Sequence, residues 1–434
     1  MQSFVYNLLL ICALPSVSLW YLWRILITKK SNKSWRGNLG AIPSFADRPK
    51  NRKLVWLHAA SVGEVVSILP VLKELRALLP DGILVLTTIT QTGNSMARKA
   101  ATDADAIGYF PLDYPITVNR ALDRLRPDVF VMVEVELWPN VLDATARRGV
   151  PSVLINGRVS DRSYRRFRWF AWLMSWAVSH VDYGLMQTAT DAERIKDMGA
   201  KKAKIDIVGS SKFDQEGGRL TDESVSELRR SFGLAEGIPV FVAGSTNPGE
   251  DEIVLNAYES MKASMPRLRL IIAPRQIERS AEIFRKASAK GFSCVYRKSD
   301  VGSDSYDVLV LNSFGELASV YALAMVTFVG GSLIPKGGHS LIQPILQGKP
   351  VLFGPYTFKT RDVAQTALRV GVGFEVTNAE TMSDKALKLF QDENQRRAID
   401  EECWRLVAEN MGASRRCAEV IARIATEHVE NTSA

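Results

Sequence analysis

The sequence has few of the residues that build metal sites, disulfide frameworks or hydrolase triads. It holds only four histidines in 434 residues, and none of them stands at zinc-ligand spacing. Its four cysteines lie far apart along the chain, which argues against a disulfide framework and favours a reducing compartment. A Gly-x-Ser-x-Gly elbow is also missing, which argues against a serine hydrolase. We therefore expect neither a metal ion nor another cofactor.

The recognised nucleic-acid motifs are missing as well. The chain carries no RNP-like, zinc-finger or basic-zipper pattern. It also lacks the Gly-Lys-Ser/Thr ending of a P-loop and a dinucleotide-binding fingerprint. A net charge of +8 therefore fits an anionic membrane surface or a phosphorylated substrate better than nucleic acid. A hydrophobic content of 46% and a charged content of 24% are those of a globular protein.

The first 23 residues contain no charge at all. From Phe4 to Trp23 the residues are mostly apolar, and as a helix they would span about 30 Å, the thickness of a bilayer core. Basic residues follow from Arg24 onwards, after the apolar run rather than before it as in a signal peptide. We predict an uncleaved single-pass anchor over residues 1–30, with the body of the protein on the cytoplasmic side. Pro15 leaves a re-entrant or interfacial segment as the alternative.

Beyond this segment, short β-rich runs alternate with helical stretches, a pattern typical of parallel sheets covered by helices on both faces. The predicted strands are Leu54–His58, Ile83–Thr88, Ala106–Tyr109, Val129–Val133 and Ser152–Ile155, and then Val240–Ala243, Leu268–Ile272, Val308–Leu311, Val326–Val329 and Val351–Phe353. They indicate an α/β protein with two Rossmann-like domains, residues 31–214 and 238–434, joined by a linker at 215–237. The second domain would include the terminal helices. Ligands of such sheets bind beyond the carboxyl ends of the strands, so we expect a site in a cleft between two facing domains.

Basic and aromatic residues are interleaved between Arg162 and Val181. Such a segment suits a membrane interface. A core helix with a basic outer face explains the same pattern, and both interpretations stay open.

Acidic residues follow two of the predicted strands. In the segment His58–Glu64, Glu64 stands where a glycine turn opens a helix. There it either stabilises the helix start or serves as a general base for a sugar hydroxyl. Glu134 and Glu136 directly follow the run Val129–Val133 and would face the same side of a continued strand. Two carboxylates placed together at a strand end favour a functional role over packing.

Glycine-rich segments follow strands in the second half. Gly244–Asp251 has small residues and backbone N–H groups suited to a phosphate. Arg275, after the run Leu268–Ile272, is placed to bind a phosphate or carboxylate. Gly330–Pro344 is longer and contains His339, which we interpret as a donor to phosphate.

These motifs, in this order, resemble those of the 3-deoxy-manno-octulosonic acid (Kdo) transferases of Gram-negative outer-membrane synthesis. The resemblance extends over nearly the whole chain and adds two further segments, Ile155–Arg158 and Gly209–Asp214. It implies a GT-B fold and an inverting glycosyltransferase without a metal. The donor would be CMP-Kdo, and the acceptor a lipid A precursor (lipid IVA) in the inner membrane. The first domain would bind the acceptor and the second the nucleotide sugar.

The resemblance also implies roles for particular residues. Glu64 matches the family's proton acceptor, while Glu134 and Lys212 match residues that stabilise the transition state. The positions that match CMP contacts are Pro274, Arg275, Gly315, Glu316, Leu317, His339, Ser340, Leu341, Ile342 and Gln343.

The chain departs from the family pattern at the nucleotide end. Ser340 and Gln343 stand where the family usually has Asn and Glu. A Gln accepts hydrogen bonds from ribose hydroxyls without the help of a charge, which costs about 1 kcal/mol. Gln276, Asn312 and Met325 are further departures. Two alternatives therefore remain: a membrane-anchored GT-B relative with a changed donor such as a UDP-sugar, or a nucleotide-binding protein without turnover.

Overall fold

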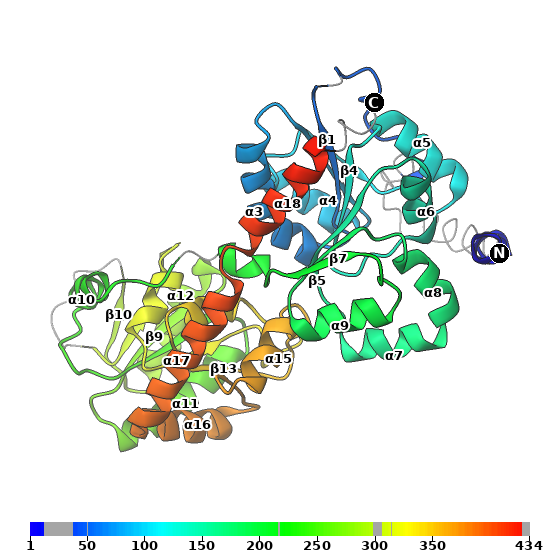
Figure 1. Ribbon diagram of the computed structural model, residues 1–434. Helices are drawn as coiled ribbons and strands as arrows, with labels where there is room; N and C mark the ends of the chain where they lie inside the picture. The colour runs from blue at the N-terminus through cyan, green and yellow to red at the C-terminus, as the bar shows by residue number, and fades with distance from the viewer. Residues whose placement is uncertain (13–37, 50, 216–217, 298–305, 314, 428–434) are drawn as a thin grey trace. The chain divides into compact units, whose positions relative to one another are not determined.

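The computed structural model describes residues 1–12, 38–49, 51–215, 218–297, 306–313 and 315–427. The chain divides into two compact units. The first comprises Met1–Gln215 together with Asn410–Ala434, and the second comprises Glu216–Glu409. Each unit is built on one parallel sheet flanked by helices (Figure 1). Two parallel-sheet α/β units of this kind form the GT-B fold class.

The first unit contains a seven-stranded sheet in the order β3-β2-β1-β4-β5-β6-β7, with every neighbouring pair parallel. Its strands are β1 (Leu54–His58), β2 (Ile83–Thr88), β3 (Ala106–Tyr109), β4 (Val129–Val133), β5 (Ser152–Gly157), β6 (Tyr183–Met186) and β7 (Lys204–Ile207). The order of strands reverses between β1 and β4. The carboxyl ends of these two strands therefore flank the position where open α/β sheets bind their ligands.

Helices cover both faces of this sheet. They are α3 (Val62–Leu78), α4 (Gln91–Ala100), α5 (Pro115–Leu125), α6 (Pro139–Arg147), α7 (Asp161–Trp169), α8 (Ala171–Val178), α9 (Ala189–Asp197) and α18 (Ala413–Glu427), with the 3₁₀ turn η1 (Ser211–Gln215). Successive strand residues point to opposite faces. Val55 and Leu57 therefore join a core with α3 and α18, whereas Leu54 and Trp56 join a core with α5 and α6.

The second unit repeats the plan with the strand order β10-β11-β9-β8-β12-β13-β14. Its strands are β8 (Val240–Thr246), β9 (Arg269–Pro274), β10 (Cys294–Tyr296), β11 (Val308–Val310), β12 (Val326–Val329), β13 (Val351–Phe353) and β14 (Gly373–Glu375). Its helices are α10 (Asp222–Ser231), α11 (Glu250–Ser264), η2 (Ile277–Arg279), α12 (Ser280–Ala289), α13 (Leu317–Val320), η3 (Tyr321–Leu323), α14 (Ile342–Leu346), α15 (Arg361–Arg369), α16 (Ala379–Gln391) and α17 (Glu393–Asn410). Here the order reverses between β8 and β12.

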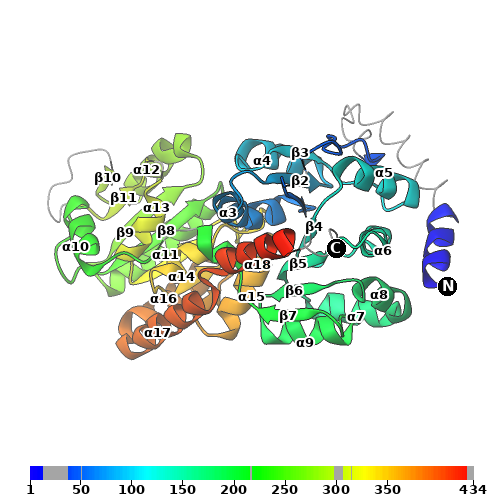
Figure 2. The same ribbon diagram turned by 45° about the horizontal axis from the view of Figure 1, so that its top comes forward.

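Two segments differ from the domain division predicted from the sequence. The predicted linker 215–237 contains the helix α10, which belongs to the second unit. The final helix α18, placed by sequence with the second domain, belongs instead to the first unit and lies along α3 (Figure 2). The cause is its apolar stripe, in which Cys417, Ile421 and Ile424 are buried in the core beneath α3.

The predicted membrane anchor lies mostly outside the described residues. Residues 2–12 are helical, and residues 13–30 are not described. Within the part of the chain that the structure describes, no helix combines the length and apolar character needed to cross a bilayer.

The packing of α18 predicts a stability effect in the first unit. Ile421→Ala should lower the free energy of unfolding of this unit by about 2–5 kcal/mol, because it leaves a cavity in a fully buried position. Urea titration followed by tryptophan emission measures this, since every tryptophan except Trp404 lies in the first unit. Arg423→Ala, at an exposed position of the same helix, should change it by less than about 0.5 kcal/mol. Equal effects of the two substitutions would contradict the packing described.

Candidate functional site in two halves

Glu64 lies in the first turn of α3, directly beyond the carboxyl end of β1. Ser61 is the N-cap of this helix. The Glu64 carboxylate accepts a hydrogen bond from the backbone N–H of Ala60 at 2.7 Å and another from the Ser61 hydroxyl at 2.7 Å. Only 8% of the residue is exposed. These short local bonds fix the carboxylate at the sheet edge where a ligand is expected.

The surroundings of Glu64 favour its protonated form. Burial, and then the negative charges of Glu136 and Glu134, raise the pKa of Glu64 to about 8. The hydrogen bonds from Ser61 and Ala60 oppose this rise but do not cancel it. A carboxylate with a pKa near the working pH is well matched to accept a proton from a hydroxyl.

Glu134 follows β4, the neighbour of β1, and pairs with a lysine from a distant segment. Its Oε1 lies 3.4 Å from Nζ of Lys212. The backbone of Glu134 is left-handed, with φ of 58°, while its N–H donates to Ile155 of β5 at 3.0 Å. Left-handed backbone in a glutamate is strained, and such strain is concentrated at functional sites. The structure thus brings Glu64, Glu134 and Lys212 to the same edge of the first sheet.

Two further residues border this half of the site. Glu136 accepts a hydrogen bond from the Trp138 indole at 3.1 Å, and burial raises the pKa of Glu136 to about 7. His58 is fully buried at the end of β1 and stacks on Phe110, with ring centroids 3.7 Å apart. Burial lowers the pKa of His58 to about 3, so this histidine is neutral at physiological pH. The ring also lies edge-on to Trp138, whose indole donates to Glu136.

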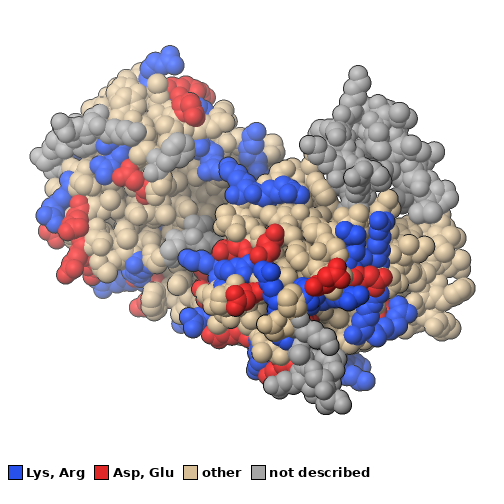
Figure 3. All heavy atoms as spheres, turned by 90° about the horizontal axis from the view of Figure 1, so that it is seen from above, with Lys and Arg blue, Asp and Glu red and all other residues tan. Residues whose placement is uncertain are grey.

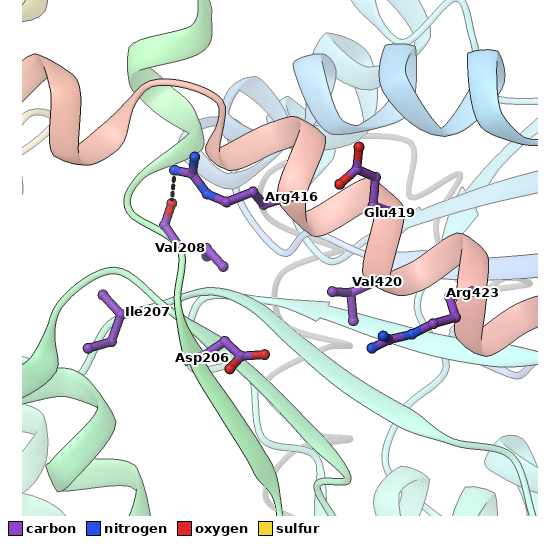
Figure 4. Close-up of a pocket in the computed structure, with 7 residues that line it drawn as sticks. All are labelled: Asp206, Ile207, Val208, Arg416, Glu419, Val420 and Arg423. Atoms are coloured by element: carbon purple, nitrogen blue, oxygen red, sulfur yellow. Dashed lines mark hydrogen bonds between the residues drawn. The ribbon is translucent and has the colours of Figure 1, made fainter.

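The segment that carries Lys212 is held by residues near the C-terminus. The Asp214 carboxylate accepts hydrogen bonds from the backbone N–H groups of Gly412 and Ser414, at 2.6 and 2.7 Å. Arg416 donates to the carbonyl of Val208 at 2.6 Å, beside a pocket between β7 and α18 (Figure 4). This pocket contains no predicted site residue. Two residues that line it, Val208 and Arg416, nevertheless form the hydrogen bond that holds the segment between β7 and Lys212 against α18.

In the second unit the glycine-rich segments bind the protein's own carboxylate. The backbone N–H groups of Asn247, Gly331, Ser332 and Leu333 all donate to Glu250. Of these amides only Asn247 belongs to Gly244–Asp251, so the predicted phosphate cradle is wrong for that N–H, which already donates to Glu250. The N–H groups of Gly331, Ser332 and Leu333, in the segment Gly330–Pro344, are occupied in the same way.

His339 lies beside the loops that follow β8 and β12. Asn247 Nδ2 lies 3.2 Å from Nε2 of His339 and also donates to the Ser245 carbonyl. Burial, with the positive charges of Arg275 and Lys359, lowers the pKa of His339 to about 4. At neutral pH the ring is therefore uncharged. Gly331 has φ of 72°, and a Cβ there would lie 2.8 Å from His339 Cδ2, so only glycine fits.

The other predicted nucleotide contacts occupy neighbouring loops. Pro274 is buried at the end of β9, whereas Arg275 is exposed and its N–H donates to Thr246 at 2.9 Å. Gly315 has φ of 86° and precedes Glu316, whose Oε1 lies 3.2 Å from Arg297 Nη2. Leu317 opens α13.

The stretch Ser340–Gln343 leads into the short helix α14. Leu341 and Ile342 are buried, so these two positions offer a ligand backbone atoms rather than side chains. Ser340 and Gln343 are partly exposed. Of the four positions, these two are the ones with partly exposed side chains.

One residue of the site, Lys359, was not singled out from the sequence, because it lies in a loop where no periodicity marks it. Asn247 lies within the predicted segment Gly244–Asp251, but its contact with His339 arises only from the fold. Glu136 was predicted together with Glu134, whereas its burial comes from tertiary packing. Among the described residues no cluster of three or more His, Cys, Asp or Glu side chains is placed to hold a metal ion.

Comparison with known proteins identifies the family of this chain. Residues 33–215 match the family model of 3-deoxy-D-manno-octulosonic-acid transferase (Kdo transferase). The Bordetella pertussis 3-deoxy-D-manno-octulosonic acid transferase is 31% identical over 432 residues, covering 96% of this chain and 98% of that protein. The chain belongs to the Kdo transferase family. It is therefore a glycosyltransferase.

Two other relatives bear on this family assignment and on the fold. A bifunctional glycosyltransferase/methyltransferase of Fusobacterium nucleatum is 33% identical over 79% of this chain, which spans 53% of that protein. The crystal structure of Neisseria meningitidis UDP-GlcNAc 2-epimerase superposes with a TM-score of 0.52 at 13% identity, covering 86% of this chain and all of that one. This structural likeness supports the fold only, and says nothing about the activity of the Kdo transferase.

The raised pKa of Glu64 predicts a pH dependence. If ionised Glu64 is the base, kcat/KM for Kdo transfer should rise about ten-fold from pH 7 to pH 9, following a pKa of about 8. Glu136→Gln removes a negative charge and keeps an acceptor for Trp138, so it should shift this rise to lower pH. Initial rates across pH 5.5–9.5 measure both. Glu74→Gln, on the same helix, is the control, and a rise unmoved by Glu136→Gln would contradict the assignment.

Proposed function

We propose that this Kdo transferase moves Kdo from CMP-Kdo to a lipid A precursor, lipid IVA, in lipopolysaccharide core synthesis. The observation that carries the proposal is the geometry at the β1/β4 edge. There a buried carboxylate with a raised pKa, Glu64, lies at the same edge as an ion pair between Glu134 and Lys212. These are the groups that an inverting single displacement on a sugar requires.

The proposed step is a single displacement. Glu64 accepts the proton of a glucosamine hydroxyl as the hydroxyl oxygen forms a bond to the anomeric carbon of Kdo. The bond from that carbon to the phosphate oxygen breaks, and CMP leaves with the bonding electrons. Glu134 and Lys212 stabilise the charge that develops at the sugar. The reaction needs neither a metal ion nor another cofactor.

The leaving phosphate is stabilised by residues of the second unit. Arg275 is exposed, and Arg275 and Lys359 both act electrostatically on His339. Two guanidinium or ammonium charges beside a neutral imidazole donor suit a departing phosphate. Pro274, Gly315–Leu317 and Ser340–Gln343 complete the proposed CMP site.

A changed donor is the second candidate, and a specific observation favours testing it. Gln343 and Ser340 are partly exposed where the family usually presents Glu and Asn. A UDP-sugar would be accepted if these substitutions reshaped the ribose and base contacts.

We further propose that the protein works at the cytoplasmic face of the inner membrane, where its lipid acceptor lies. In the segment Arg162–Val181, which forms α7 and α8, some aromatic side chains fit the core interpretation and others fit the membrane interpretation. Tyr164 and Phe167 pack against the core, whereas Trp169 is 87% exposed and Phe170 is 66% exposed. Arg165, Arg166 and Arg168 are exposed beside them. Exposed aromatics flanked by arginines suit the headgroup region of an anionic bilayer.

The N-terminal helix lies beside this surface. Gln2 donates to the Trp172 carbonyl at 2.8 Å, and Tyr6 donates to Asp113 at 2.8 Å. Phe4, Leu8, Leu9 and Ile11 of the same helix are exposed. On the face that Figure 3 shows, acidic and basic side chains of the described residues lie interspersed. The exposed apolar side chains of this helix, together with Trp169 and Phe170, are what supports the proposed membrane surface.

The catalytic proposal predicts the outcome of a substitution and of a donor panel. Glu64→Ala should lower kcat by about 10²- to 10⁴-fold, because the proton acceptor is lost, while the CMP dissociation constant stays within about two-fold. Transfer from CMP-Kdo and from a panel of CMP- and UDP-sugars to lipid IVA measures the activity. Glu74→Ala, elsewhere on α3, is the control. Near-normal turnover of Glu64→Ala, or product only from a UDP-sugar, would refute the proposal.

The membrane proposal predicts contact between Trp169 and lipid. In vesicles of phosphatidylethanolamine and phosphatidylglycerol with brominated acyl chains, part of the tryptophan emission should be quenched. Trp169→Phe should reduce the quenched part, because a residue that inserts at the interface is removed. Trp404→Phe removes another exposed tryptophan, one in α17 of the second unit, and should leave the quenched part unchanged. If Trp169→Phe changed nothing, this surface would not be the one that meets lipid.

A further inference from the structure

Two consecutive acids at the start of α11, Glu250 and Asp251, are both completely buried. Burying a carboxylate is costly unless hydrogen bonds or an opposite charge compensate it. Glu250 accepts hydrogen bonds from the loops after β8 and β12, and Asp251 pairs with an arginine that follows β9.

Glu250 gathers four backbone N–H groups. Its Oε2 accepts from Asn247 at 2.9 Å and from Gly331 at 2.7 Å. Its Oε1 accepts from Ser332 at 3.0 Å and from Leu333 at 2.9 Å. One side chain thus joins the loop after β8 to the loop after β12, the two strands between which the strand order reverses.

The position of His339 depends on these same two loops. The N–H of His339 donates to Gly330 at 3.2 Å, and the N–H of Gly338 donates to Gly331 at 2.7 Å. Asn247 holds the imidazole Nε2 from the other side. A shift of the loop released from Glu250 would therefore move His339.

Asp251 makes the second connection. It forms an ion pair with Arg279, the last residue of η2, which follows Pro274–Gln276. The loop that carries Arg275 is thus tied to α11 at its far end, while the Arg275 N–H ties it to Thr246 at its near end. The Oδ1 atom of Asp251 has no partner among the described residues, so this connection is the looser of the two.

We propose that Glu250 and Asp251 are positioning residues for the nucleotide end of the donor. They hold His339 and Arg275 in place without touching the nucleotide. This inference rests on the proposed function, because it takes the loops after β9 and β12 as the CMP site.

A matched control exists in the same unit. Asp307 also accepts hydrogen bonds from backbone and side chain, from Ser293 N and Oγ at 3.0 Å each, and pairs with Lys262 at 2.7 Å. It precedes β11 and so lies at the amino edge of the sheet, opposite the proposed site. Asp307→Asn should destabilise the unit without altering nucleotide binding.

The test compares Glu250→Gln, Asp251→Asn and Asp307→Asn in the full-length protein. In Glu250→Gln the amide N–H₂ would face backbone N–H donors, so the loop should shift. We expect the CMP dissociation constant from calorimetry and the KM for CMP-Kdo to rise ten-fold or more, with the KM for the lipid acceptor within two-fold. Asp251→Asn should raise the CMP dissociation constant and the KM for CMP-Kdo about three-fold. Asp307→Asn should lower the melting temperature but leave both constants within two-fold.

Measurements are made well below each melting temperature. If Glu250→Gln does not fold, Glu250→Asp keeps the charge but withdraws it by one methylene, and should raise the CMP dissociation constant in the same direction. Unchanged CMP affinity in the folded Glu250 variants would overturn the inference, as would an equal loss in Asp307→Asn. A wild-type protein that neither binds CMP nor uses CMP-Kdo would overturn the proposed function as well. Normal wild-type transfer with unaffected variants would overturn this inference alone.

Discussion

A carboxylate in the first turn of the helix that follows the first strand organises each unit. Glu64 holds this place in α3 after β1, and Glu250 holds it in α11 after β8. Both sheets are wholly parallel, so this position lies at their carboxyl edge. The strand order reverses beside β1 in the first sheet and beside β8 in the second, which is where such sheets bind ligands. Glu64 and Glu250 therefore occupy equivalent positions in the two sheets, yet their surroundings differ. The difference arises from how many donors each carboxylate meets.

Glu250 accepts hydrogen bonds from four backbone N–H groups and joins two loops. Glu64 meets one amide and one hydroxyl, and it lies near two other acids. Four donors compensate the burial of a charge, whereas two donors beside like charges do not. The pKa of Glu64 therefore rises to about 8, which suits this carboxylate to accept a proton.

The sequence predicts ten of the fourteen described strands, because each of the ten is a short run of apolar, often β-branched residues bounded by turns. The other four, β6, β7, β10 and β14, were not predicted. Leu54–His58 and Val326–Val329, for example, begin and end where predicted. The candidate acids are also visible, since Glu134 directly follows such a run and Glu64 opens the helix after one. Long-range contacts are not visible in this way. Asp214 binds Gly412 across almost 200 residues, and nothing local to either one indicates that α18 returns to the first unit. For the same reason, the sequence does not show that Glu250 accepts the hydrogen bonds of the glycine-rich loops. Glu250 and Gly331 come into contact only in the folded unit.

The charges of the two half-sites divide the proposed reaction between them. The first unit presents Glu64, Glu134 and Glu136, and its Lys212 is engaged by Glu134. A surplus of negative charge there keeps a proton acceptor basic but repels a phosphate. The second unit presents Arg275 and Lys359 around a neutral His339, and its buried acids are already satisfied by loops. Removal of the hydroxyl proton and departure of the phosphate need opposite fields. The first unit thus carries the groups suited to the first of these steps, and the second unit the groups suited to the other.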